Sequence, residues 1–175
     1  NGEIYNYKEL KKELLKLGHK FKTNSDTEIV LTSYLEWGNS LVDKFIGMFS
    51  FAIFDKNKQK LLLFRDRAGV KPLFYYFKDG TFLFSSEIKS FHKSKQFDNT
   101  IDLDSVALFF RHGYIDSPYS IYKYVKKLKP GHYLDFDIQN KSSNIYKYWD
   151  AIDYYNKPKL DISFNEGKKR LADLL

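Results

Sequence analysis

The sequence predicts an α+β protein in which antiparallel sheet packs on sheet and helices lie outside them. Three observations support this class. Helical periodicity with start and stop signals fills the first 45 residues. Residues 48–85 alternate short apolar runs with polar turns, as β-hairpins do. Aromatic residues make up 18% of the 175 residues, which is typical of β-rich packing. This length suits one domain, or one domain and a tail.

A first helix is predicted after Asn6. Asn6 can cap this helix, and Glu9, three residues later, is the return half of a capping box. Gly18 lies where a helix commonly ends in a left-handed residue. Between these signals one helical face is apolar and contains Leu10, Leu14, Leu15 and Leu17.

A second helix is predicted from residues 25–28, Ser-Asp-Thr-Glu, which have the pattern of another capping box. The helix is expected to stop at Gly38, and a short helical turn is expected around residues 39–45. Its apolar residues are Ile29, Val30, Leu31, Tyr34, Leu35 and Trp37.

Two hairpins are predicted next. Strands at 48–55 and 60–65 flank a polar turn, and strands at 72–77 and 81–85 flank a second turn. These strands carry apolar residues on both faces, which is typical of a sheet that is covered on both sides. We therefore expect residues 48–85 to form two antiparallel hairpins buried between helical layers.

The remaining residues give weaker signals. A short helix is predicted to begin within 86–91, and Asp104 is predicted to cap another helix. Residues 119–149 have the pattern of loops and short strands, with a strand at 132–137. Residues 150–162 resemble a linker, and a new amphipathic helix begins at Ser163. Because the chain lacks an initiator Met and a final helix cap, we expect a piece of a longer protein, cut at both ends.

Composition excludes several classes of function. The formal net charge of +7 is compatible with nucleic-acid binding, but the lysines are scattered and arginine, the main reader of bases, is scarce. No apolar run approaches about 18 residues, so no membrane span is expected. The absence of cysteine excludes disulfides, thiolate metal sites and a cysteine nucleophile within these residues. The four histidines are scattered, and no metal-binding motif is predicted.

Six segments follow one another along the chain. They are NGEIYNY at 1–7, SDTE at 25–28, FIGMFSFA at 45–52, RDRAGVKPLFY at 65–75, FSSEIK at 84–89, and KPGH at 129–132 with YW at 148–149. Together these segments resemble the glutaminase domain of glutamine-dependent asparagine synthetases, which are class II glutamine amidotransferases. A single such motif would be weak, whereas six in order are specific. One departure is Ala68, where the family pattern has Phe.

The resemblance implies a fold and a domain organisation. It implies a four-layer sandwich of antiparallel sheets between helical layers, of the N-terminal-nucleophile hydrolase type, truncated at the N-terminus. Residues 1–150 would be a partial glutaminase domain. Residues 151–175 would be the linker and the first helix of an ATP-dependent synthetase domain.

The resemblance also implies four site residues. In the family a cysteine at the mature amino terminus attacks the glutamine amide, with its own α-amine as the base. The resulting oxyanion is held by donors that match the Asn1 side-chain amide and the Gly2 backbone N–H. Glycine suits this place because the backbone can approach the substrate closely. The carboxylates that hold the α-amine of glutamine match Glu3 and Asp26. From the residues alone, without the resemblance, a helix cap is the favoured interpretation of Asp26, and a disordered terminus is the favoured interpretation of Asn1 and Glu3.

The family's other components have no match in these residues. The nucleophilic cysteine, the upstream arginine for the glutamine carboxylate and the SGGLDS motif are absent. The resemblance therefore implies that this chain alone is inactive and binds no cofactor. It implies a cytoplasmic parent protein that uses ATP and Mg²⁺ to activate aspartate and amidates it with ammonia from glutamine. A homodimer is compatible with it.

Two other functions remain open. One is a glutaminase domain of a related amidotransferase with another acceptor, such as a surface sugar or a secondary metabolite; only the synthetase half separates it from an asparagine synthetase. The other is a non-catalytic module that binds protein or nucleic acid, for which binding would depend steeply on salt.

A charged cluster, Arg65-Asp66-Arg67, follows the second predicted strand. Such charges can line a site, but more often they pair with one another and fix a loop. We favour the structural role here, with Lys71 near a domain interface.

Overall fold

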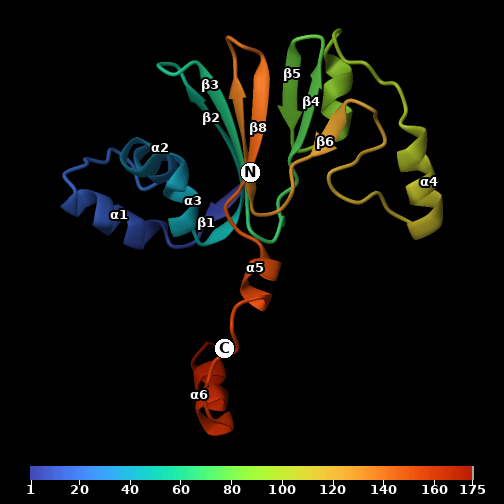
Figure 1. Ribbon diagram of the computed structural model, residues 1–175. Helices are drawn as coiled ribbons and strands as arrows, with labels where there is room; N and C mark the ends of the chain where they lie inside the picture. Colours follow the sequence, from blue (N-terminus) through green and yellow to red (C-terminus); the bar gives the residue numbers. More distant parts are fainter. Residues whose placement is uncertain (175) are drawn as a thin grey trace.

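The computed structural model describes residues 1–174, which form two antiparallel sheets with helices outside them (Figure 1). The larger sheet has the strand order β1-β2-β3-β7-β8 and the smaller one the order β5-β4-β6. The α+β class with antiparallel sheets is therefore confirmed. The strands are β1 (Gly2–Ile4), β2 (Gly47–Asp55), β3 (Lys60–Arg65), β4 (Phe74–Lys78), β5 (Thr81–Ser85), β6 (Val125–Lys127), β7 (His132–Asp137) and β8 (Ser142–Lys147).

The first predicted helix is α1 (Tyr7–Lys16), and its two ends differ in how well they were predicted. At the C-terminus, Gly18 has a φ of 94° and its N–H donates to Leu15 O, while His19 N–H donates to Leu14 O. These two bonds form a Schellman motif, as the glycine indicated. At the N-terminus the predicted capping box is wrong, because Asn6 makes no side-chain cap bond.

Asn6 instead ties the start of α1 to the segment that precedes β2. Its Nδ2 donates to Lys44 O at 2.9 Å, and its Oδ1 accepts from Ile46 N–H at 2.9 Å. The amide side chain thus forms two hydrogen bonds with a backbone segment about 40 residues away. Hydrogen bonds between residues so far apart leave no signal in the local sequence pattern.

The second predicted helix is α2 (Asp26–Trp37), followed by the 3₁₀ turn η1 (Gly38–Ser40) and the short helix α3 (Leu41–Lys44). Ser25 is its N-cap and accepts from Thr27 N–H at 3.2 Å. The second half of the predicted capping box is wrong: Glu28 accepts from Lys22 N–H and Thr23 N–H, so it fixes the approaching loop rather than Ser25.

Helices α1 to α3 cover one face of the larger sheet (Figure 1). Fully burying one such aliphatic or aromatic side chain stabilises the fold by about 1.5–3 kcal/mol. The buried residues of this core are Ile4, Leu10, Leu14, Ile29, Val30, Leu41, Val42, Phe45, Phe49, Ile53, Leu62 and Phe64.

The opposite face of the larger sheet packs on the smaller sheet through a second core, formed by Leu63, Leu73, Leu128, Leu134 and Phe136. The two predicted hairpins, β2–β3 and β4–β5, are both present but belong to different sheets. The expectation that both faces are covered throughout is wrong for β2. Ala52 and Phe54 on this strand are exposed, because the smaller sheet lies over β3 and β7 and leaves β2 open.

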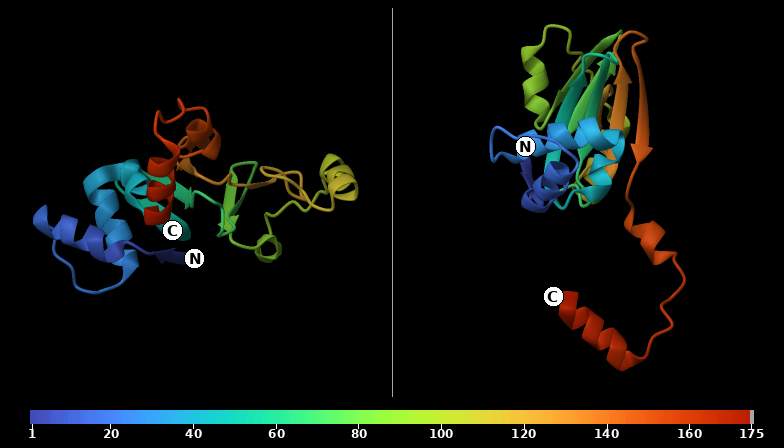
Figure 2. Two further views of the ribbon diagram at one scale, coloured as in Figure 1. Left: turned by 90° about the horizontal axis from the view of Figure 1, so that it is seen from below. Right: turned by 90° about the vertical axis from the view of Figure 1, so that its left-hand side faces the viewer.

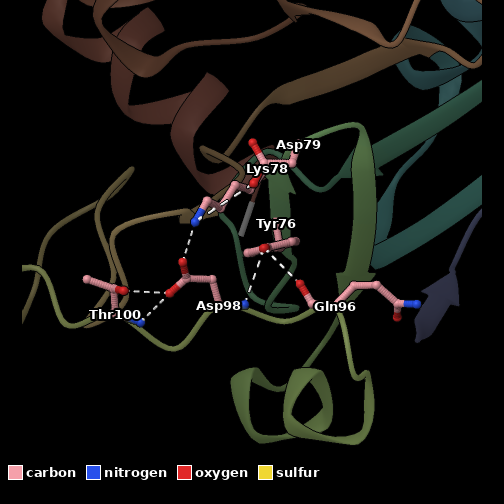
Figure 3. A network of polar contacts seen from close by, with 6 residues as sticks. All are labelled: Tyr76, Lys78, Asp79, Gln96, Asp98 and Thr100. Atoms are coloured by element: carbon pink, nitrogen blue, oxygen red, sulfur yellow. Dashed lines mark hydrogen bonds and ion pairs between the residues drawn. The ribbon is translucent and has the colours of Figure 1, made fainter.

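The outer face of the smaller sheet is covered by the 3₁₀ helix η2 (Ile88–Lys93) and the loop that follows it. Figure 3 shows how polar contacts hold this loop. Tyr76 Oη donates to Gln96 O at 3.1 Å and accepts from Asp98 N–H at 3.2 Å, while Lys78 forms an ion pair with Asp98. The outermost layer over the smaller sheet is therefore a 3₁₀ helix and the loop that follows it.

Helix α4 (Leu103–His112) extends to one side of the smaller sheet (Figure 1). Its N-cap residue is Asp102, so the prediction that Asp104 caps it is wrong by two residues. Asp104 lies in the first turn instead, where a carboxylate is favourable because of the positive helix N-terminus.

The chain after β8 leaves the sheets and continues as two short helices, α5 (Ala151–Tyr155) and α6 (Phe164–Leu174) (Figure 2). The predicted linker thus contains a helix, and the predicted last helix is present. None of the helices within residues 1–174 has the length and apolar composition needed to cross a bilayer.

Candidate active site

A cavity of about 340 Å³ lies where β1, β2 and the start of α2 meet. All four predicted site residues, Asn1, Gly2, Glu3 and Asp26, line it. The structure therefore brings together residues that are more than 20 positions apart in the sequence. The rest of the wall is mostly apolar and consists of Ile4, Thr27, Val30, Leu31, Phe49, Phe51, Ala52 and Ile53.

Strand β1 is held at the cavity by antiparallel pairing with β2. Asn1 and Ser50 exchange both backbone hydrogen bonds, at 3.1 and 2.8 Å. Gly2 follows with a φ of 114°, and a Cβ at this position would lie 2.0 Å from Met48 O. Glycine is therefore required by the approach of two protein strands. The close approach of substrate, which was the predicted reason for a glycine here, is not needed to explain it.

The Gly2 N–H is directed away from β2. Because Asn1 and Ser50 form a hydrogen-bonded pair, alternation makes Gly2 and Phe49 a pair that is not hydrogen-bonded. Consistently, Phe49 N–H donates to Asp66 Oδ2, at 3.2 Å. Two residues after Gly2, Ile4 N–H lies on the same outer edge of β1. The Gly2 N–H is thus available as a donor beside the cavity.

Asp26 is the first residue of α2 and is half-buried. Since Ser25 is the N-cap, the interpretation of Asp26 as a helix cap is wrong. Its Oδ2 accepts from Ile4 N–H at 3.3 Å, so the carboxylate bonds the outer edge of β1. The start of α2 and the strand that carries Gly2 are thereby joined at the cavity.

The Asn1 side chain points toward the end of the smaller sheet, where its Nδ2 donates to Ser86 Oγ at 3.3 Å. From the sequence, Ser86 stands out only as part of the segment 84–89, with no predicted role at the site. The signal was available in that motif, but the contact with Asn1 depends on the packing of two separate sheets. Glu3 is exposed and adds a second carboxylate to the cavity wall.

Asp66 fixes the backbone next to the cavity, including that of the lining residue Phe49. This carboxylate is buried and accepts backbone hydrogen bonds from Phe49 and Lys71 at Oδ2 and from Val70 at Oδ1, at 2.9–3.2 Å. The flanking arginines bind carbonyl oxygens: Arg65 those of Lys71, Leu128 and Gly69, and Arg67 those of Phe45 and Asp43. The expected loop-fixing role is confirmed, although the three side chains bond to the backbone and not to one another.

This arrangement combines two chemical features. A free N–H and a side-chain amide can stabilise a developing oxyanion, and two carboxylates can bind an ammonium group. Within residues 1–174 there is no group of three or more side chains placed to hold a metal ion.

Comparisons with known proteins agree with this chemistry. The model of a glutamine amidotransferase domain matches residues 1–149. A protein of Methanocaldococcus jannaschii, provisionally named glutamine-hydrolysing asparagine synthetase 2, is 44% identical over 178 residues; the match covers 99% of this chain and 33% of that protein. Glutamine-hydrolysing asparagine synthetase 3 of Bacillus subtilis is 40% identical over 152 residues, with 86% and 24% covered. The chain thus spans about a third or less of the length of these relatives.

Solved structures agree on the fold. Glutamine phosphoribosylpyrophosphate amidotransferase from B. subtilis, complexed with ADP and GMP, superposes with a TM-score of 0.57 at 18% identity. The match covers 85% of this chain and 28% of that one. At this identity the likeness shows the fold alone, and it confirms the predicted amidotransferase fold of the N-terminal-nucleophile type.

Proposed function

The chain belongs to the glutamine amidotransferase domain family, and we propose that its cavity is part of the glutaminase site of a glutamine-hydrolysing asparagine synthetase. The observation that carries this proposal is the convergence of Asn1, Gly2, Glu3 and Asp26 on one cavity. Glutamine hydrolysis involves an oxyanion, which the Gly2 N–H and the Asn1 amide can bind. The substrate also has an α-ammonium group, which the two carboxylates can bind.

The proposed roles are those that the resemblance implies, and the geometry is compatible with them. Gly2 N–H, left free by β-pairing, donates to the oxyanion, and the Asn1 amide adds a second donor by turning from Ser86. Asp26, already placed by Ile4 N–H, binds the α-ammonium of glutamine together with Glu3. Because the 175 residues contain no cysteine, the nucleophile of this scheme comes from chain outside them. The isolated chain should therefore release no ammonia from glutamine.

In the complete protein the ammonia is proposed to pass to a synthetase domain. There ATP and Mg²⁺ would activate aspartate, and asparagine would form. The match of relatives three to four times longer than this chain supports such a second domain. We place the boundary near residue 150, where the chain leaves the sheets. A related amidotransferase with another acceptor would share everything described for residues 1–150.

The substitution Asp26→Asn in the complete protein tests the glutaminase assignment. Asparagine keeps an oxygen for Ile4 N–H, so the free energy of unfolding should change by less than about 1 kcal/mol. A charge-assisted hydrogen bond to substrate is worth about 1.5–3 kcal/mol, so kcat/KM for glutamine should fall about ten- to a hundredfold. Synthesis from free ammonia should be unchanged, because that route does not use the glutamine cavity.

A matched control is Asp104→Asn. Asp104 also lies in the first turn of a helix, but it lines a different cavity. This control should leave both nitrogen sources unaffected. Equal losses with glutamine and with ammonia in Asp26→Asn, accompanied by a lower melting temperature, would show that Asp26 only supports the fold.

A further inference from the structure

A second cavity, of about 420 Å³, lies between the two sheets and is separate from the cavity lined by Asn1 and Asp26. Its wall takes residues from β4 and β6 of the smaller sheet and from β7 and β8 of the larger one. Basic side chains dominate, and none of its described lining residues is acidic. These basic residues are Lys126, Lys127, Lys129, His132 and Lys147. We call this the basic cavity.

Two of these lysines have no carboxylate partner within residues 1–174. The Lys126 Nζ lies 4.9 Å from the centre of the Tyr119 ring, a contact that leaves its charge in place. For Lys129, no hydrogen bond or ion pair of the side chain is found among residues 1–174. Lysines on a protein surface are usually free, but here both free ammonium groups belong to the wall of one concave site.

Lys127 is a third cation whose charge is not neutralised by an ion pair within the described residues. Its Nζ donates to the carbonyl of Ile115, and burial lowers the pKa of its ammonium group, with the charge of Arg65 acting in the same direction. Asp116 opposes this shift from a distance. A partly desolvated cation of this kind gains free energy when an anion approaches.

Among these basic residues, Lys147 is the one that forms an ion pair within the described part of the chain. Its Nζ lies 2.7 Å from Asp153 of helix α5, the first helix after the sheets. This carboxylate therefore belongs to the segment that leads the chain away from the sheets, as does Asp150, whose charge also raises the pKa of Lys147.

The basic cavity continues into a smaller one of about 270 Å³, with which it shares Lys129 and His132. His132 Nδ1 is bonded to Pro130 O at 2.7 Å, which leaves the other ring nitrogen for a ligand. Arg67, Trp149 and Asp150 line the extension. The extension therefore has side chains of both charge signs, whereas the basic cavity itself is lined by cations without a carboxylate.

We propose that the basic cavity binds a small phosphate-bearing anion, with a diphosphate as the simplest form whose several negative charges match the several lysines of the wall. Several lysines converging on a concave wall suit phosphate, because its oxygens accept hydrogen bonds in all directions and lysine binds it as a point charge. The cavity lies within the size range of small-molecule sites. A nucleic-acid backbone would instead need a stripe of cations over an open surface. This inference does not depend on the proposed glutaminase function.

Titration calorimetry of the 175-residue chain with pyrophosphate, and separately with ADP, tests the proposal. The variant Lys126→Gln/Lys129→Gln should weaken binding about tenfold or more, since charge-assisted hydrogen bonds are lost. The control Lys12→Gln/Lys16→Gln removes the same charge from exposed positions on α1 and should change affinity by less than about twofold. A third variant, Asp153→Asn, frees Lys147 and should strengthen binding about two- to fivefold.

The outcomes separate clearly once circular dichroism has shown that each variant is folded. Binding of pyrophosphate but not ADP would identify a free diphosphate, and equal or tighter binding of ADP a nucleotide; both support the site. Equal weakening in the two lysine pairs would mean attraction by net charge alone and would overturn it. So would the absence of binding by the unmodified chain to both probes.

Discussion

At the scale of single residues, the absence of a Cβ at Gly2 allows β1 to pair closely with β2. Gly2 and Gly18 both have a positive φ, near 114° and 94°, but a Cβ at Gly2 would meet Met48 O at 2.0 Å whereas a Cβ at Gly18 would meet nothing within 4 Å. A side chain would be strained by the backbone at both positions, but it would clash with a neighbouring strand only at Gly2. They form a natural pair for substitution.

We expect Gly18→Ala to lower the free energy of unfolding by about 1–2 kcal/mol, the cost of a left-handed residue with a side chain. Gly2→Ala should in addition detach β1 from β2. Hydrogen exchange would detect this as faster exchange at Ser50 N–H, which bonds Asn1 O at 2.8 Å. If Ser50 exchanges equally slowly in both variants, β1 does not need the close approach described for Gly2.

Residue roles were predictable where they depend on neighbours in the sequence. The glycine after α1 and the serine before α2 do what their local patterns indicated. The hydrogen bonds of Asn6 and Ser86 were not predicted, because their partners lie between 38 and 85 positions away in the sequence. These partners are Lys44 and Ile46 for Asn6, and Asn1 for Ser86. The four site residues came from the family resemblance, and periodicity alone would not have connected Asp26 with the first three residues.

At the scale of elements, the loop over the smaller sheet depends on an ion pair that acid should break. Hydrogen bonds from Lys78 and Thr100 lower the pKa of the Asp98 carboxyl group. A lowered pKa in the folded state adds stability above the unfolded pKa of about 3.9, and this stability is lost as the pH falls through the folded value.

We therefore expect Asp98→Asn to lower the melting temperature slightly at pH 7, with a smaller effect at high salt because the pair is partly exposed. The difference from the unmodified chain should shrink progressively below about pH 4. Melting curves of both proteins between pH 7 and pH 2 provide the measurement. A difference that stays constant down to pH 2 would mean that the carboxylate charge does not hold this loop.

The strands themselves were well predicted, and their grouping was not. Alternation located β2, β3, β4 and β5 to within two residues at either end. It did not show that the two hairpins belong to different sheets, since apolar residues on both faces of a strand are compatible with a helix or with another sheet as the covering layer. The exposure of Phe54 could not be predicted for the same reason. How far the smaller sheet extends over the larger one depends on residues that are distant from Phe54 in the sequence.

At the scale of the whole molecule, residues 1–150 and the last two helices differ in how they are held. Residues 157–161 are exposed, and α5 is tied to β8 by the ion pair between Lys147 and Asp153 (Figure 2). A segment with so few buried contacts opens at little cost in free energy.

Limited proteolysis should therefore cut first within residues 156–163 and leave a resistant core that ends near residue 150. The core should retain the stability of the full chain to within about 0.5 kcal/mol, because the removed residues bury little apolar surface. Mass spectrometry of the fragments and urea unfolding of the core provide the two readings. First cuts inside the sheets, or a core much less stable than the chain, would contradict a domain boundary near residue 150.

The bond between Asp26 and Ile4 N–H has a thermodynamic consequence. The carboxylate that would receive the ammonium group of a ligand also secures the outer edge of β1. Ligand affinity and the docking of β1 are then linked equilibria, and the coupling free energy between them is the same in both directions. Anything that fixes β1 more firmly would remove part of the ordering cost of binding, and a bound ligand would in turn slow the local opening of the strand. The first four residues would thus report on occupancy of the cavity as well as form its wall.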